Sequence, residues 1–304
     1  MAKLHADFNA DLLAIARQQL TEEWGPEVQQ IPDARVLSSF VDSLRRRPAV
    51  RPRTLWIADN FRCPPEHAQG WTILQQKIVN GVDLRPHLSR GHSFLDMLDG
   101  LLNEWGVHHL HLGAASPGGN SSHVTRTGPV LFARITEQDF YAINVYPHGS
   151  WENSSILESL HRNWPESIRN YRLNGVDGEP LTEKRRRSLR RVNAQVATTV
   201  ADGTVYMAIG GGVASSGTSM EAAMRSDMLW SDVEQLQVAV QEQLEKLLPQ
   251  LQKSGYAGQQ EIKAILVGIT AEAFQVSFPD FEVLSNVTLE GGWFHGRHRL
   301  DGTR

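Results

Sequence analysis

The stretches VHHLHL (107–112), VLFARIT (130–136) and FYAINVY (140–146) decide the fold that this sequence predicts. Each has the length and the β-branched and aromatic content of a strand, and polar segments separate them. FLDMLDGLLNEW (94–105) precedes them and predicts a helix, because its apolar residues repeat at helical spacing. A second helix is expected from about 154 to 162. Helix, three strands and helix in this order predict an antiparallel meander covered on one face, which is an α+β fold.

Three parts are expected along the chain. Residues 1–62 form a helical N-terminal segment with a short strand near its end, and a proline pair in 60–65 indicates a boundary. Residues 63–173 form the central α+β domain. Residues 174–304 start with the turn-rich NGVDGEP and predict a C-terminal α+β region with a long helix and a final group of strands.

The composition excludes several classes of protein. Apolar residues make up 40% of the 304 positions, which is typical of a globular chain with a sizeable core. Cys63 is the single cysteine, so an internal disulfide and a cysteine-based zinc cluster are both excluded. The first residues lack the uninterrupted apolar core of a signal peptide, and no apolar run is long enough to span a bilayer. We therefore expect a cytoplasmic protein with no membrane contact.

Basic residues are concentrated in two islands although the net charge is −4. The islands run from 45 to 62 and from 162 to 191, and 24 of the 30 basic residues are arginine. A guanidinium group binds phosphate bidentately, so the islands favour a nucleic acid, above all RNA, as partner, although a solvated surface explains them equally well. EKRRRSLRR (183–191) predicts a helix with charge all round, which buries no face. Within it Arg185, Arg186 and Arg187 are candidate substrate-binding residues.

Histidines form the clearest functional signal. Eight of the twelve lie between positions 87 and 161. Since side chains of a strand alternate between its two faces, Leu110 and Leu112 are expected on one face and His109 and His111 on the other. If the aliphatic faces of the three strands pack under the preceding helix, the other face carries these residues: His109, His111, Arg134, Asn144, Tyr146 and His148.

Such a face fits the cleavage of RNA without a metal or other cofactor. His109, His111 and His148 would share the base and acid roles, and Arg134 and Arg126 would contact the phosphate. Tyr146 would orient the phosphate and Asn144 would contact the substrate. Residues 114–127 form a long loop beside this face, which is expected to act as a lid.

Two other readings of the same residues stay open. His109 and His111 lie on one side of a strand and can bind zinc or manganese with His148 or His123 as a third ligand, which would make the protein a metal-dependent hydrolase. Alternatively, the histidines are structural, and the chain is a non-catalytic module that binds a nucleic acid or a protein. A protein partner or a homo-oligomer is compatible with all three readings.

One resemblance accompanies these observations. WGVHHLHLG (105–113), then RTGPVLFARI (126–135), a strand ending at His148 and HRNWPE (161–166) resemble a pattern found in bacterial proteins that carry no assigned activity. The resemblance covers roughly residues 81–165. The order of helix, meander and helix is also similar to that of the small ribonuclease toxins of toxin–antitoxin systems, which implies an endoribonuclease of a toxin or defence type.

Overall fold

The computed structural model describes residues 2–115, 122–270 and 273–289. The chain forms two compact units, one made of 1–41 together with 223–304 and the other of 42–222. The two boundaries expected from the sequence, near residues 62 and 173, both lie inside the second unit. Helices and small sheets occur in both units, so the mixed α+β class is confirmed. Among the described residues, no helix combines the length and the apolar character needed to cross a bilayer.

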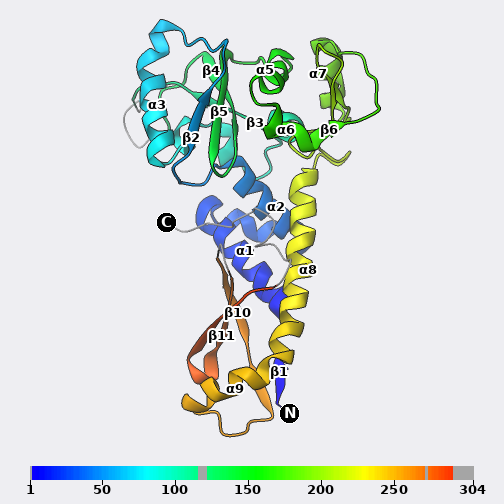
Figure 1. Cartoon of the computed structure of the whole chain (residues 1–304). Helices are drawn as coiled ribbons and strands as arrows, with labels where there is room; N and C mark the ends of the chain where they lie inside the picture. The colour runs from blue at the N-terminus through cyan, green and yellow to red at the C-terminus, as the bar shows by residue number, and fades with distance from the viewer. Residues whose placement is uncertain (1, 116–121, 271–272, 290–304) are drawn as a thin grey trace. The chain divides into compact units, whose positions relative to one another are not determined.

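The first unit combines helices with two small sheets (Figure 1). Asp7 begins α1 by accepting a hydrogen bond from the Ala10 amide, and buried apolar residues then recur every fourth position. Strand β1 pairs in parallel with β9, and β10, β11 and β12 form an antiparallel sheet. Its elements are β1 (Lys3–His5), α1 (Phe8–Trp24), α9 (Leu244–Lys253), β9 (Glu261–Lys263), β10 (Ile265–Ile269), β11 (Phe274–Phe278) and β12 (Val283–Val287), together with most of α2 (Asp33–Arg46) and α8 (Met220–Glu242).

The second unit contains the residues of the candidate site. Its strands are β2 (Thr54–Ile57), β3 (Val107–His111), β4 (Pro129–Ile135), β5 (Asp139–Pro147), β6 (Arg172–Leu173), β7 (Thr198–Thr199) and β8 (Val205–Tyr206). Its α-helices are α3 (Ala68–Asn80), α4 (Gly100–Trp105), α5 (Ser155–Asn163), α6 (Pro165–Ile168) and α7 (Glu183–Arg191). Short 3-10 turns occur at Pro65–His67, Arg85–His87, Arg90–Ser93 and Arg169–Tyr171.

A four-stranded sheet in the order β2-β5-β4-β3 forms the centre of this unit. Strands β3, β4 and β5 are successive and antiparallel, and β2 adds a fourth strand parallel to β5. Phe132 pairs with Asn144 and Ala133 with Ala142, so Ile143 is the additional residue of a bulge in β5. Because of the bulge, the alternation of side chains between the two faces of the sheet is shifted by one residue between the first and second halves of β5.

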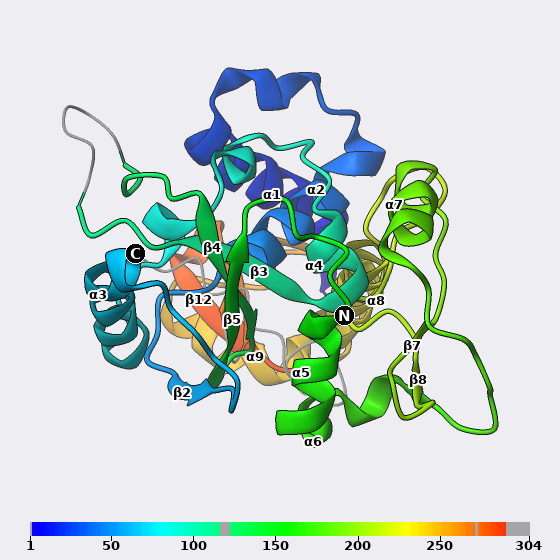
Figure 2. The same ribbon diagram turned by 90° about the horizontal axis from the view of Figure 1, so that it is seen from above.

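Apolar residues cover both faces of this sheet, whereas the sequence predicts one covered face. Leu110, Leu131 and Ala142 pack with Trp71 and Leu74 of α3. On the other face, Val107, Phe132 and Ile143 pack with Ile156 and Leu160 of α5. Figure 2 shows α3 on one side of the sheet and α5 with α6 on the other. A functional group of the sheet therefore reaches solvent at an end of the strands and not across an open face.

The helix expected at 94–105 begins only at Gly100. Arg46 donates hydrogen bonds to the carbonyl oxygens of Phe94 (2.8 Å) and Leu95 (2.9 Å), which are the acceptors that a continuous helix would use. Asp99 then caps α4 by accepting from the Leu102 amide. Hydrogen bonds from Arg46, which is distant in the sequence, thus take the place of helical hydrogen bonds at the start of the expected helix.

Candidate active site

Strand β3 places His109 and His111 on the face that also carries Val107. His109 exposes 9% of its surface and His111 exposes 1%. They pair across the sheet with Phe132 and Val130 of β4. His148 follows the last residue of β5, and its amide donates to the Gly128 carbonyl at 2.8 Å. The histidines therefore meet at the end of the sheet where β3 ends, β4 begins and β5 ends.

The three imidazole rings and one indole ring lie in contact range. The His148 ring lies 5.9 Å from that of His111 and 6.1 Å from that of His109. The Trp151 ring lies 4.6 Å from His109 and 4.9 Å from His148. His148 is exposed and Trp151 half-buried. We call His109, His111, His148 and Trp151 the His cluster.

Hydrogen bonds hold His111 in one orientation. Its Nδ1 accepts from the Thr127 amide at 3.1 Å, and its carbonyl oxygen lies 2.8 Å from Nδ1 of the fully buried His87. Lys77 Nζ lies 3.0 Å from His87 Nε2. Because Nδ1 of His111 is an acceptor, the neutral ring carries its proton on Nε2, and this buried atom has no partner among the described residues. His111 thus presents a fixed N–H donor.

Burial and positive neighbours keep the inner histidines neutral. Burial, together with the charges of Arg126, His109 and His148, lowers the pKa of His111 to about 3. Burial also lowers the pKa of His109 to about 4, with additional repulsion from His148 and Arg126. Nδ1 of His109 is buried and has no partner among the described residues. An anion bound here would remove the repulsion and would meet unpaired nitrogen atoms.

One arginine, Arg126, lies near enough to His109 and His111 to repel their protonated forms. Arg126 is exposed and donates to the Leu88 carbonyl at 3.4 Å. Burial lowers its pKa, and the nearby charge of Arg90 lowers it further. Arg126 thus lies near the histidines, and Arg90, which was not among the predicted residues, lies near Arg126. Repulsion between the two guanidinium groups favours a bound anion.

Three further predicted site residues have their own partners in the sheet. Arg134 is at the Val107 end of the sheet, where it donates to the Ser167 carbonyl (3.4 Å) and lies over the Tyr171 ring. Asn144 is at the bulge, and its side chain accepts from the Arg62 amide at 2.8 Å. Tyr146 packs against Phe132 at 5.6 Å between ring centroids. Arg134 is thus at the other end of the sheet from the His cluster, whereas Tyr146 pairs with Val130, which in turn pairs with His111.

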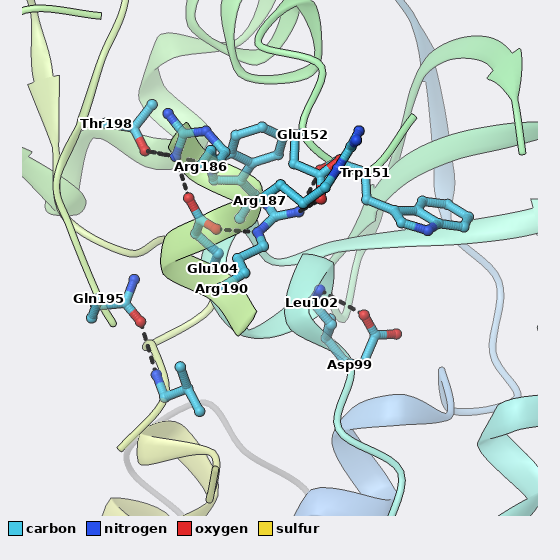
Figure 3. Close-up of polar contacts among 12 residues, drawn as sticks. Asp99, Leu102, Glu104, Trp151, Glu152, Arg186, Arg187, Arg190, Gln195 and Thr198 are labelled. Carbon is cyan, nitrogen blue, oxygen red and sulfur yellow. Dashed lines mark hydrogen bonds and ion pairs between the residues drawn. The ribbon is translucent and has the colours of Figure 1, made fainter. Parts of the chain in front are cut away.

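The predicted basic helix is α7, and the expectation that it buries no face is wrong (Figure 3). Arg186 is 2% exposed and donates to Glu104 and, at 3.0 Å, to Thr198. Arg190 donates to the other oxygen of Glu104, and both guanidinium groups lie 4.9 Å from the Trp105 ring. Arg186 is therefore a buried structural residue and not a substrate contact.

The other two candidates of this helix keep access to solvent. Arg187 is half exposed and pairs with Glu152 at 3.2 Å, and Arg185 is exposed. Arg190 also donates to the Trp151 carbonyl at 2.6 Å. Helix α7 is thus fastened to the turn that carries His148 and Trp151 (Figure 3).

For the alternative metal reading, the part of the chain that the structure describes contains no group of three histidine, cysteine or acidic side chains placed to hold a metal ion. Residues 116–121 of the predicted lid lie outside the described residues. In the described remainder, the amides of Val124 and Thr125 donate to the carbonyl oxygens of Pro86 and Ala115. His123, the other proposed ligand, lies there with Nδ1 at 3.2 Å from Ser122 Oγ.

Comparison with known proteins finds no match. No protein-family model, curated protein or solved structure is similar to this chain at a significant level. The resemblances noted for the sequence therefore stay predictions, and the site is interpreted from its own geometry.

Sequence reasoning missed the residues that hold the site together. His87, Thr127, Glu104 and Glu152 each act on a partner far along the chain. His87 belongs to the histidine-rich segment, which is a usable signal. For the other three residues the sequence contains no local pattern that indicates the partner.

Proposed function

We propose that this protein is an RNA phosphodiesterase, an endoribonuclease that uses histidine acid–base catalysis. The observation that carries the proposal is the convergence of His109, His111 and His148 beside Arg126, with repulsive interactions among them. A phosphate group bound here would offset the repulsion that opposes protonation of these histidines. The reading agrees with the toxin or defence type of ribonuclease that the sequence resemblance implies.

In the proposed reaction the ribose 2′-oxygen attacks the adjacent phosphorus and the bond from phosphorus to the 5′-oxygen breaks. His109 accepts the 2′-hydroxyl proton, and the protonated form of His148 gives a proton to the leaving 5′-oxygen. The products are a 2′,3′-cyclic phosphate and a free 5′-hydroxyl, so atoms and protons balance. The bound phosphate raises the pKa of His109 from its low value in the free protein, which makes it a better base.

His111 has a different role from the one expected from the sequence. Its Nδ1 is occupied by the Thr127 amide, so it donates from Nε2 to a non-bridging phosphate oxygen and does not exchange a proton. Arg126 contributes positive charge to the same phosphate. Trp151 forms the wall against which the rings of His109 and His148 pack.

Cleavage of end-labelled RNA by the purified protein tests the proposal. We expect cleavage with and without EDTA, strong loss in His109→Ala and His148→Ala, and no loss in His5→Ala, which removes an exposed histidine of the first unit. RNA with 2′-O-methyl groups is expected to resist cleavage. Absence of cleavage with RNA binding retained would refute the enzyme and favour the binding module, and loss with EDTA would favour the metal hydrolase.

A further inference from the structure

Helix α7 has two basic faces with different environments. Arg186 and Arg190 are four residues apart and so lie on one face, where Glu104 accepts hydrogen bonds from both. Lys184, Arg185 and Arg191 lie on the opposite face, because an α-helix has about 3.6 residues per turn. The positive charge of the inner face is compensated by the buried Glu104 carboxylate and by the Trp105 ring.

The outer face has much less compensation. Lys184, Arg185 and Arg191 are exposed and make no ion pair with any carboxylate in the described ranges. The first residue of the helix, Glu183, is the acidic group on this element. Because the inner ion pairs hold the helix in place, its backbone loses little conformational entropy when the outer cations bind a ligand.

Contacts join this helix to the His cluster. Arg190 donates to the Trp151 carbonyl at 2.6 Å, and Arg187 pairs with Glu152, the next residue along the chain. The Trp151 ring in turn packs on His109 and His148. Helix α7, which carries the outer face, is therefore attached to the turn of the candidate active site through Arg190 and Arg187.

We propose that the outer face of α7, formed by Lys184, Arg185 and Arg191, is a phosphate-binding surface for the RNA strand whose scissile phosphate lies at the His cluster. The inference rests on the proposed function, because it takes RNA as the ligand. A strand that reaches both places must extend beyond the two nucleotides that flank the scissile phosphate. Cations of this kind contact the backbone and add affinity without base specificity.

Binding of a fluorescein-labelled 20-nucleotide 2′-O-methyl RNA, followed by anisotropy at several salt concentrations, tests this inference without cleavage. The variant Lys184→Gln/Arg185→Gln/Arg191→Gln is expected to bind about 100-fold more weakly at about 0.1 M salt and to lower the salt slope by about 2, from about 0.7 per phosphate contact on a single strand. The matched control Arg35→Gln/Lys246→Gln/Lys253→Gln removes the same charge from exposed positions of the first unit and is expected to bind as wild type.

The outcomes separate this inference from the proposed function. Wild-type affinity in the α7 variant, equal losses in both variants, or no RNA binding by the wild-type protein overturns the inference, even if a dinucleotide is cleaved. Selective loss in the α7 variant supports it, even if no RNA is ever cleaved. Where cleavage occurs, the α7 variant should lose activity on the long RNA and keep it on a dinucleotide. Thermal melts of both variants show that each is folded.

Discussion

Replacement of Glu104 by glutamine tests the argument that buried ion pairs hold α7 in place. Glu104 accepts hydrogen bonds from Arg186 and Arg190, and the three side chains expose 9%, 2% and 15% of their surface. Removing one partner of a buried pair costs about 3–5 kcal/mol, because the remaining charge stays buried. Glutamine keeps the shape and one acceptor oxygen, so we expect a loss near the lower end, about 3 kcal/mol.

Urea unfolding followed by circular dichroism measures this loss. With a slope of about 3 kcal/mol per molar urea, the midpoint is expected to fall by about 1 M. The control Glu166→Gln breaks an ion pair with Arg169 whose side chains are 79% and 70% exposed, and exposed pairs contribute about 0–1 kcal/mol. A Glu104→Gln midpoint as close to wild type as that of Glu166→Gln would refute the reasoning. It would mean that the network of Figure 3 contributes little to stability.

Three further predictions follow from other contacts. Gly70→Ala is expected to lower the free energy of unfolding by about 1–3 kcal/mol, because its Cβ would lie 1.7 Å from the Leu112 carbonyl oxygen. The control Gly128→Ala, whose Cβ would have nothing within 4 Å, should be nearly neutral. Thermal melts compare the two variants, and equal melting temperatures would contradict the close packing of α3 on residue Leu112. Burial lowers the pKa of His87 to about 4, so the unfolded chain binds more protons than the folded chain between about pH 6.5 and 4, and stability falls as the pH falls through this window. In His87→Gln the free energy of unfolding, measured by urea melts, should depend on pH less steeply, by about 1.4 kcal/mol per pH unit. An unchanged dependence on pH would count against a buried neutral His87. Inorganic phosphate is expected to bind with proton uptake at about pH 5.5, since it raises the pKa of His109 from about 4. Calorimetry in two buffers of different ionisation enthalpy measures the uptake, which His109→Ala should reduce, and binding with no proton uptake would be evidence against phosphate at the His cluster.

Local patterns in the sequence were sufficient for the fold class and for part of the site. Alternation along 107–112 separates His109 and His111 from Leu110 and Leu112, because successive side chains of a strand point to opposite faces. Position 148, at the end of the third strand-like stretch, lies beside them because three successive antiparallel strands bring that end next to β3. These inferences need only neighbouring residues and a meander order.

The tertiary structure decided the residues whose partners are distant. The bulge at Ile143 turns Asn144 toward the backbone of residues 60–62, and Arg46 takes the carbonyl groups on which a helix at 94–99 would depend. Arg186 and Arg185 are adjacent in one charged run, yet one is buried and one exposed, because Glu104 lies 82 residues before Arg186 and meets only that side of the helix. The Arg186 charge is buried because the fold places the Glu104 carboxylate and the Trp105 ring beside it, and no local pattern in EKRRRSLRR indicates the position of these two partners.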